Sequence, residues 1–188
     1  MLFDKQKTDI LGNQDKSIKK SIDKDIAPLV DKITKSKNYF TTSSCSGRIC
    51  ILAVNDKHLK NKSRWLYITH KSASFKDIKK SLKKIKNLDL WFMQESMILH
   101  VVCRTIEDAL FLVQIAKDAG FKRSGIVSVG NKILVEISST EKIETPIAKK
   151  GKIIVTDSYF KILIKEANKK LKRTKEKIKK VKTTFSSL

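Results

Sequence analysis

The sequence predicts an α+β fold in which helices pack on a mixed β-sheet. Short apolar runs that are typical of strands alternate with segments whose apolar residues recur at helical spacing. The chain has six glycines, and no Gly-x-Gly-x-x-Gly motif follows any apolar run, which argues against a Rossmann-type fold. From residue 157 onward, lysines separate apolar residues at helical spacing, which predicts one long basic C-terminal helix.

A chain of 188 residues has the size of one domain. We expect residues 1–20 to form an N-terminal extension that is poorly ordered or loosely packed. Residues 21–156 then form an α/β core, and residues 157–188 form the basic helix that packs on this core. Apolar residues make up 40% of the chain, which is enough to fill a core.

Apolar residues at helical spacing predict a first helix from about Asp25 to Lys35, with Asp25 as its cap. Pro28 then lies in the first turn, where its missing N–H is not needed. Two strands are predicted next, at residues 48–54 and 65–69.

Ser74, followed three residues later by Asp77, has the capping-box pattern and is expected to open a second helix. Two strand-like runs follow at residues 88–93 and 98–103. We expect these runs to pair as a hairpin across residues 94–96.

The third helix has clear start and stop signals in the sequence. Thr105 is the expected cap, Asp108 is the third residue of the helix, and Gly120 ends it. Because its apolar residues cover more than one face, we expect it to be the most deeply buried helix.

Two more strands, at residues 126–129 and 133–137, flank Gly130 and Asn131, which are typical of a two-residue hairpin turn. Residues 143–148 and 153–155 are expected to add edge strands. A strand–helix–strand pattern spans residues 65–93, and a similar one spans residues 98–138, so the pattern indicates a possible internal β-α-β duplication.

The net charge of +22 is concentrated toward the C-terminus. Residues 149–188 contain fourteen Lys or Arg and three Asp or Glu, so half of the net charge lies in the last forty residues. This excess favours a surface that binds a polyanion. The alternative is a solvated basic tail in a lysine-rich protein.

The run from Thr41 to Arg48 is interpreted as a loop, because an apolar core would leave its hydroxyl groups without partners. Gly47 lets the backbone approach a ligand closely, and Arg48 offers a planar pair of N–H donors to a carboxylate or phosphate. The residues alone support two interpretations about equally: an anion-binding loop, or an ordinary turn with a buried cysteine.

His70 and His100 lie in or at the end of predicted strands. An imidazole changes its protonation state near neutral pH, so either residue could accept a proton from a substrate nitrogen. A single histidine in a strand is more often structural, and this alternative stays open. Cys103, on the same strand as His100, is assigned to packing.

The three cysteines are scattered without a Cys-x-x-Cys pair, and the three histidines lack the helical spacing of metal ligands. We therefore predict no metal site. No apolar run approaches the length of about 18 residues that a membrane span requires, and the N-terminus lacks the apolar core of a signal peptide. These observations predict a cytoplasmic protein that does not bind membranes.

Four segments resemble signature blocks of the wybutosine-synthesis protein 3 family, and they occur in the family's order. They are residues 39–49 (YFTTSSCSGRI), 65–71 (WLYITHK), 99–104 (LHVVCR) and 116–126 (AKDAGFKRSGI). With weaker segments between them, the resemblance covers roughly residues 15–180. One block departs from the family pattern, because Lys20 stands where the family has glycine before a serine.

Members of this family are tRNA methyltransferases that use S-adenosylmethionine. They methylate the N4 atom of a tricyclic guanosine derivative next to the anticodon of phenylalanine tRNA. The resemblance therefore implies this activity, S-adenosylmethionine as cofactor and the anticodon region of tRNA-Phe as partner. It also implies a fold distinct from Rossmann-type methyltransferases and makes residues 21–156 the catalytic core.

The site prediction combines the residues with the resemblance. The catalytic candidates are His70 and His100. The cofactor-binding candidates are Ser43, Ser44, Ser46, Gly47, Arg48, Ser124 and Gly125. The RNA-binding candidates are Lys71, Arg104, Lys122, Arg123, Lys169, Lys170, Lys172 and Arg173.

Two other functions stay open from the residues alone. One is a non-catalytic, basic tRNA-binding module, which the charge would support by itself. The other is a phosphate-handling enzyme built on the loop from Ser43 to Arg48. Neither alternative predicts affinity for S-adenosylmethionine, so a binding titration separates them from the methyltransferase. We expect a monomer, although the sequence does not specify the oligomeric state.

Overall fold

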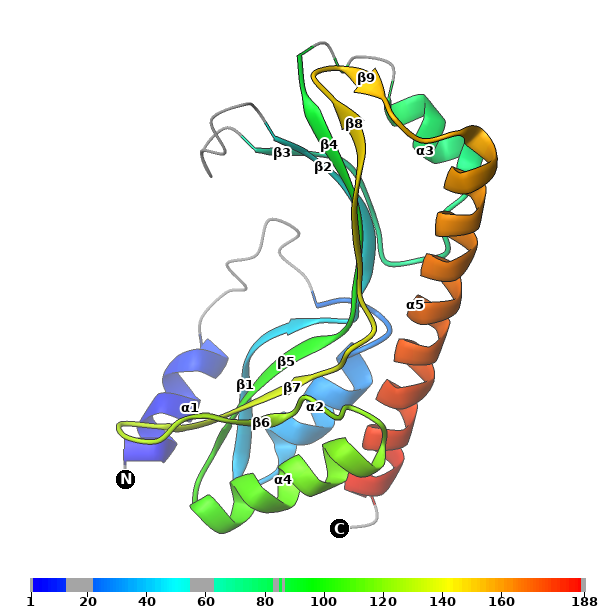
Figure 1. The fold of residues 1–188 in the computed structure, drawn as a ribbon. Helices are drawn as coiled ribbons and strands as arrows, with labels where there is room; N and C mark the ends of the chain where they lie inside the picture. Colours follow the sequence, from blue (N-terminus) through cyan, green and yellow to red (C-terminus); the bar gives the residue numbers. More distant parts are fainter. Residues whose placement is uncertain (1, 13–21, 55–62, 83–84, 86, 187–188) are drawn as a thin grey trace. The chain divides into compact units, whose positions relative to one another are not determined.

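A computed structural model describes residues 2–12, 22–54, 63–82, 85 and 87–186 (Figure 1). The helices of this part are α1 (Leu2–Gly12), α2 (Ala27–Lys35), α3 (Phe75–Ser81), α4 (Ile106–Asp118) and α5 (Asp157–Ser186). The strands are β1 (Tyr39–Cys45), β2 (Arg48–Val54), β3 (Arg64–Thr69), β4 (Asp89–Glu95), β5 (Ile98–Cys103), β6 (Gly125–Ser128), β7 (Ile133–Ser138), β8 (Ile143–Lys149) and β9 (Lys152–Ile153).

The strands form two antiparallel sheets, which confirms the predicted α+β class. One sheet has the strand order β1-β5-β7-β6, and the other has the order β3-β2-β4-β8-β9. Every strand pair of the described residues is antiparallel, so the strands do not form the single mixed sheet that was expected.

The predicted duplication corresponds to a split β-α-β motif in each sheet. Helix α3 connects β3 to β4, and both strands pair with β2, which lies between them. Helix α4 connects β5 to β6, and these strands flank β7 in the same way. In each motif, the two strands joined by the helix are parallel to each other, because both are antiparallel to the central strand.

The chain divides into two compact units, and each unit contains one of the sheets. Unit 1 comprises residues 1–46, 97–140 and 175–188, and unit 2 comprises residues 47–96 and 141–174. The units therefore draw on separated segments, whereas the sequence-based division used three consecutive ones. Helix α5 contributes its first part to unit 2 and its last part to unit 1.

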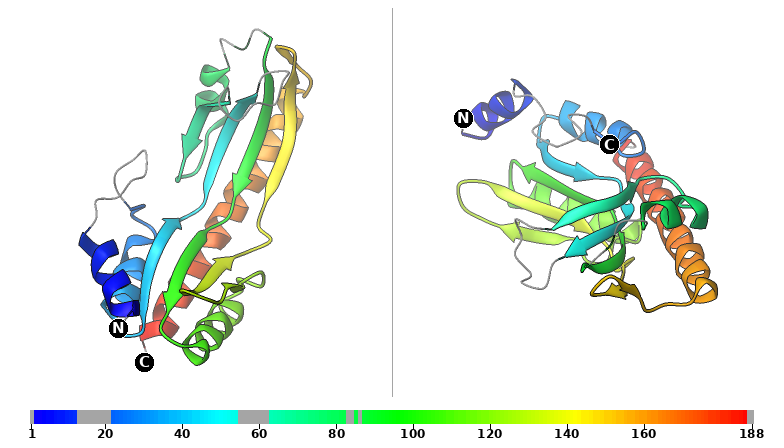
Figure 2. Two further views of the ribbon diagram at one scale, coloured as in Figure 1. Left: turned by 90° about the vertical axis from the view of Figure 1, so that its left-hand side faces the viewer. Right: turned by 90° about the horizontal axis from the view of Figure 1, so that it is seen from above.

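In unit 1, the helices α2 and α4 and the end of α5 cover one face of the sheet (Figure 2). Alternate residues of β5, among them Leu99 and Val101, face this core and are fully buried. Helix α1 covers part of the other face, where the ring of Phe3 lies 5.1 Å from that of Phe40. The rest of that face carries the polar side chains described below.

In unit 2, helix α3 and the first part of α5 pack on the sheet. Phe160 of α5 makes edge-to-face contacts with Phe92 of β4 and Phe75 of α3, at centroid distances of 5.7 and 6.0 Å. The Asn168 side chain of α5 bonds both backbone groups of Ala73 at 2.8 and 2.9 Å, which fixes the start of α3 against α5.

The local signals of the sequence are confirmed. The Ser74 hydroxyl accepts a bond from the Asp77 N–H at 3.1 Å, and Thr105 and Asp108 form a complete capping box. Gly120, with φ of +100°, follows the last turn of α4, where a residue with a Cβ atom would be strained. The strands predicted at residues 126–129 and 133–137 pair as β6 and β7, but residues 129–132 connect them, so the turn is longer than the two residues expected.

Four expectations are wrong in detail. The run that starts at Thr41 is strand β1 as far as Cys45, because its backbone pairs with β5 at the edge of the sheet, where hydroxyls can reach solvent. The strands β4 and β5 do not pair with each other but belong to different sheets. Asp25 does not cap α2; it forms an ion pair with Lys175 at 2.6 Å.

The fourth concerns the burial of α4. Its apolar residues do not all lie in the core, because Leu110 and Phe111 are 57% and 44% exposed. The helix buries one face only, and Phe111 lies at the edge of a groove that is considered below.

Candidate functional site

A row of three hydrogen-bonded side chains crosses the sheet of unit 1. Ser43 of β1 lies opposite His100 of β5, and His100 lies opposite Glu136 of β7. The Ser43 hydroxyl is 2.7 Å from His100 Nδ1, and His100 Nε2 is 3.0 Å from the Glu136 carboxylate. The side chains of His100 and Glu136 are 28% and 31% exposed, so the row is open to a ligand.

A β-bulge in β1 places Ser43 in this row. Thr41 pairs with Val101, and the next pair is Ser43 with His100, so Thr42 is the extra residue. Without the bulge, Thr42 would oppose His100, because side chains alternate between the faces of a strand. The extra residue therefore turns the Ser43 hydroxyl toward the imidazole.

The hydrogen-bond partners of His100 determine which ring nitrogen carries the proton when the imidazole is neutral. A carboxylate can only accept hydrogen bonds, so the Glu136 contact places the imidazole proton on Nε2. The lone pair of the neutral ring then lies on Nδ1, where the Ser43 hydroxyl donates to it. This arrangement allows His100 to accept a proton at Nδ1, directly or through the Ser43 hydroxyl, while Glu136 stabilises the imidazolium that forms.

Unit 2 contains a second polar cluster, around Arg48. Arg48 of β2 lies opposite Glu95 of β4, and its Nε atom donates to the Glu95 carboxylate. The guanidinium carbon lies 4.7 Å above the ring of Trp65 on β3, which is a cation–π arrangement. The three strands of the split motif therefore each contribute one side chain to a charged and aromatic surface.

His70 lies in unit 2 and differs from His100 in its tautomer. Its Nδ1 atom is 2.9 Å from the carbonyl oxygen of Gly47, which can only accept. In the neutral ring, the proton is therefore on Nδ1 and the lone pair on Nε2. Gly47 has a φ of +91°, so the position that His70 contacts requires glycine.

Two of the predicted cofactor-binding serines make hydrogen bonds within the protein. The buried Ser46 donates its backbone N–H and its hydroxyl to Asp23, at 3.0 and 3.2 Å. The buried Ser124 donates its hydroxyl to the Phe121 carbonyl at 2.7 Å and accepts from the Ser138 N–H at 3.3 Å. Both hydroxyls hold turns in place.

The other two candidates lie on strands of unit 1. Ser44 pairs with Leu99 and is half-buried on β1. Gly125 begins β6 and pairs with Glu136, next to the row, and a Cβ atom at this position would meet no heavy atom within 4 Å.

The predicted RNA-binding residues of the core differ in exposure. Arg104 is held by a bidentate ion pair with Asp4, and its guanidinium lies 4.4 Å above the ring of Phe3. The Arg104 bond also holds the pKa of the Asp4 carboxyl well below its usual range. Lys71, Lys122 and Arg123 are exposed.

On α5, ion pairs hold three of the four predicted residues. Lys169 pairs with Glu166 at 2.6 Å, whereas Lys170 and Arg173 share Glu141 at 3.4 and 3.1 Å. Lys172 is exposed and makes no ion pair within the part of the chain that the structure describes. The apolar stripe of this helix is confirmed, and it enters the cores of both units.

Cys103 is a packing residue, as expected. Its side chain is buried in the core of unit 1, on the face opposite His100. Burial, with a smaller contribution from Asp108, raises the pKa of the Cys103 thiol to about 12. The residue is therefore a neutral thiol at physiological pH and not a nucleophile.

Sequence reasoning missed Glu136 and Glu95. Each acts through a partner on a neighbouring strand, Glu136 through His100 and Glu95 through Arg48, and the partners are 36 and 47 positions apart in the chain. Strand register is the only signal that links them, and it is not visible in a single sequence.

No helix among the described residues is long and apolar enough to cross a membrane.

Comparison with known proteins gives a consistent result. Residues 5–187 match the family model described as "Methyltransferase TYW3". The chain is 38% identical over 188 residues to a Pyrococcus horikoshii protein named tRNA(Phe) 7-((3-amino-3-carboxypropyl)-4-demethylwyosine(37)-N(4))-methyltransferase 1, covering 99% of this chain and 96% of the relative. It is 37% identical to a Bos taurus protein named tRNA wybutosine-synthesizing protein 3 homolog, covering 94% of this chain and 69% of the relative.

Solved structures agree with the fold. A Pyrococcus horikoshii protein superimposes with a TM-score of 0.90 at 38% identity, covering 97% of this chain and 95% of that one. A hypothetical protein from Aeropyrum pernix superimposes with a TM-score of 0.75 at 25% identity, covering 88% and 98% of the two chains.

Proposed function

Because the chain belongs to the TYW3 family of methyltransferases, we propose that it methylates N4 of a 4-demethylwyosine-type guanosine at position 37 of tRNA(Phe). The donor in this proposal is S-adenosylmethionine, and the row Ser43–His100–Glu136 handles the proton. The observation that carries the catalytic part is the position of His100 between a hydroxyl and a carboxylate.

The reaction requires a proton acceptor, because the acceptor nitrogen carries a hydrogen that must leave when the methyl group arrives. His100 Nδ1 takes this proton, either directly or by way of the Ser43 hydroxyl. Glu136 keeps the Nε2 atom protonated and stabilises the positive charge that develops on the ring. General bases of this kind contribute roughly 10²- to 10⁴-fold to the rate.

The cluster Arg48–Glu95–Trp65 fits S-adenosylmethionine in the chemistry of its groups. An indole ring that is 37% exposed can stack on an adenine, a guanidinium can bind a carboxylate, and a carboxylate can bind ribose hydroxyls or an ammonium group. When bound, the cofactor supplies an electrophilic methyl group. Holding donor and acceptor in line is then the main task of the protein.

The basic residues supply binding to the tRNA. Four of them are exposed and suit contacts with phosphates: Lys71, Lys122, Arg123 and Lys172. Contacts of this kind do not read the base sequence. Binding near position 37, the monomeric state and the lack of a metal requirement belong to this proposal as predictions.

A labelling experiment tests the proposal. The protein is incubated with S-adenosylmethionine labelled in its methyl group and with tRNA(Phe) that carries the tricyclic 4-demethyl base, with unmodified tRNA(Phe) as the control. We expect label only in the tricyclic tRNA, at N4 of residue 37 after digestion and mass spectrometry. Binding of tRNA without affinity for S-adenosylmethionine would instead support a non-catalytic RNA-binding module.

A further inference from the structure

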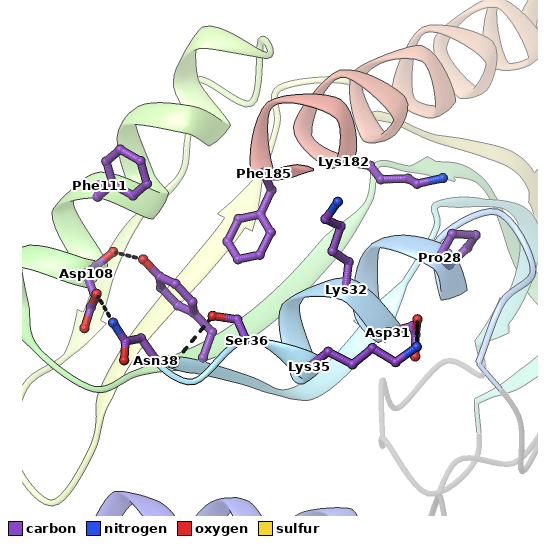
Figure 3. Close-up of a pocket in the computed structure, with 11 residues that line it drawn as sticks. Pro28, Asp31, Lys32, Lys35, Ser36, Asn38, Asp108, Phe111, Lys182 and Phe185 are labelled. Atoms are coloured by element: carbon purple, nitrogen blue, oxygen red, sulfur yellow. Dashed lines mark hydrogen bonds and ion pairs between the residues drawn. The ribbon is translucent and has the colours of Figure 1, made fainter. Parts of the chain in front are cut away.

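Unit 1 contains a groove on the side of its sheet that the row Ser43–His100–Glu136 does not use. The groove has a volume of about 850 Å³ and lies between α2, α4 and the end of α5 (Figure 3). Its floor includes Tyr39, which belongs to the same core as Leu99 and Val101. His100 alternates with these residues along β5 and faces the opposite side, so the groove is a separate site.

The acidic groups of the wall are already engaged within the protein. Asp31 forms an ion pair with Lys35 at 2.9 Å. Asp108 accepts bonds from the Asn38 amide at 3.0 Å and from Thr105, whose helix cap it completes.

Three lysines line the groove against these two aspartates, so its charge is positive overall. Two of these lysines, Lys32 of α2 and Lys182 of α5, stand on two different helices at the wall. Lys32 makes no ion pair with any residue of the described ranges. The wall therefore suits an anion of the size of a phosphate group.

An exposed aromatic ring lines the same groove, across from these lysines in Figure 3. Phe111 of α4 is 44% exposed and lines the groove, as Figure 3 shows. The rings of Tyr39 and Phe185 also line the groove, where they pack edge to face at 5.4 Å and form an apolar floor. The hydroxyl of Tyr39 donates to the Asp108 carbonyl at 3.1 Å, which fixes the floor to α4.

We propose that this groove binds a nucleotide of the tRNA strand other than the one that is methylated. The base stacks on Phe111, and Lys32 and Lys182 bind its phosphate. A flat ring and ammonium groups within one groove are the combination with which proteins hold unstacked nucleotides without reading their sequence. This inference rests on the proposed function for the identity of the RNA, but it concerns a different face of unit 1.

Two neighbouring residues of α4 provide a matched test of stacking. Phe111→Ala removes the ring at the groove, whereas Leu110→Ala removes a side chain that is 57% exposed and does not line it. With unmodified tRNA(Phe) as the probe, Phe111→Ala should weaken binding about 5- to 150-fold. Leu110→Ala should leave the dissociation constant unchanged.

The phosphate contact is tested by salt dependence. Lys32→Gln should make the plot of the logarithm of the tRNA association constant against the logarithm of the salt concentration less steep, by about 0.7 to 0.9. Lys117→Gln, which neutralises an exposed lysine of α4 outside the groove, should lower the slope by much less. Circular dichroism of each variant verifies that the fold is retained.

Wild-type affinity for tRNA in both Phe111→Ala and Lys32→Gln would overturn the inference. A loss of affinity for S-adenosylmethionine with unchanged tRNA binding would also overturn it, because the groove would then hold the cofactor. If wild-type protein binds tRNA through the groove but transfers no methyl group, the proposed function fails and the groove inference stands.

Discussion

The two units share a split β-α-β motif but place different side chains opposite a glutamate on it. In unit 1, the pair is His100 and Glu136, on a flanking strand and the central strand. In unit 2, the pair is Arg48 on the central strand and Glu95 on a flanking strand. Both pairs lie directly across from each other on adjacent strands, and both are partly exposed.

The difference concerns what each pair can do with a proton. An imidazole gains and loses a proton near neutral pH, whereas a guanidinium stays charged in proteins. The pair in unit 1 is therefore suited to proton transfer, and the pair in unit 2 to the binding of an anionic or planar group. In the proposed function, the same scaffold therefore supplies proton transfer in one unit and ligand binding in the other.

The largest expected effect comes from replacing each of the two histidines by asparagine. In His100→Asn, the asparagine cannot accept the proton, so turnover should fall about 10²- to 10⁴-fold. In His70→Asn, the amide nitrogen can occupy the place of Nδ1 and keep the bond to the Gly47 carbonyl, so turnover should fall less than about tenfold. Steady-state kinetics with saturating tRNA and cofactor measures both.

The binding constants serve as the control for this pair. Both variants should bind S-adenosylmethionine and tRNA with wild-type affinity. If His70→Asn has the larger loss of turnover, the base lies in unit 2, and the functional division between the units is reversed.

The next largest effect is a difference in cofactor affinity between variants of the two partly exposed arginines. Arg48→Ala should weaken S-adenosylmethionine binding about 10- to 150-fold, because a charge-assisted bond contributes roughly 1.5–3 kcal/mol. Arg104→Ala breaks the contacts with Asp4 and Phe3, so it should loosen α1 without changing cofactor affinity. Isothermal titration measures the first result, and amide exchange in α1 measures the second.

Equal cofactor affinity in Arg48→Ala and wild type would remove unit 2 from the cofactor site. Full methyl transfer in the same variant would contradict the role of the residue altogether.

A smaller effect is expected when the helix cap of each unit is removed. Ser74→Ala and Thr105→Ala should each lower the free energy of unfolding by about 1 kcal/mol, within a range of roughly 0.5–2. Each hydroxyl also bonds the aspartate three residues on, but only Asp108 is shown to hold a further side chain, Asn38, so Thr105→Ala should be nearer the upper end. Urea denaturation measures both, with Thr105→Ser as the control that keeps the hydroxyl. A cost in Ser74→Ala larger than in Thr105→Ala would contradict this ranking.

The smallest effect is the response of unit 1 to alkaline pH. Burial raises the pKa of the Cys103 thiol from its ordinary value of 9.0 to about 12, and it raises the pKa of Tyr39 as well. The folded state holds these protons more tightly than the unfolded state, so this stability is present below pH 9 and is lost as the pH rises toward 12.

Cys103→Ala removes one of these protons, so the stability of the variant should decline less steeply as the pH rises. The measurement is the urea midpoint at pH 7, 9 and 10.5 for both proteins, each compared with its own value at pH 7. An equally steep decline in the variant would show that Cys103 does not contribute.

The features that the sequence predicted well depend on neighbours in the chain. Thr105 and Asp108 are three residues apart, and Gly120 must tolerate its positive φ whatever lies around it. Such signals act within one turn of backbone, so they are visible before the fold is known.

The features that the sequence did not predict depend on pairing between distant strands. The hydroxyl-rich run from Thr41 was assigned to a loop, because its partner β5 lies more than fifty residues away. A separation of 36 residues likewise concealed the link between His100 and Glu136. Of the predicted site, His100 and Arg48 gain specific partners in the structure, whereas the Ser46 and Ser124 hydroxyls hold turns.

The packing of the C-terminal helix determines how its basic charge can be tested. Its buried residues enter both cores, with Leu171 in unit 2 and Ile178 in unit 1. Truncation before Lys169 would therefore remove core residues from both units along with the basic charge. Neutralising the exposed Lys172 and its neighbours tests the role of the charge without this loss.

The central claim, that His100 accepts the proton, is tested most directly by the rate of single-turnover methyl transfer with saturating cofactor and tRNA. His100→Asn should lower this rate about 10²- to 10⁴-fold, because the amide cannot accept a proton. Glu136→Gln, which keeps an acceptor for the Nε2 proton but removes the negative charge, should lower it less. A wild-type rate in His100→Asn would contradict the account.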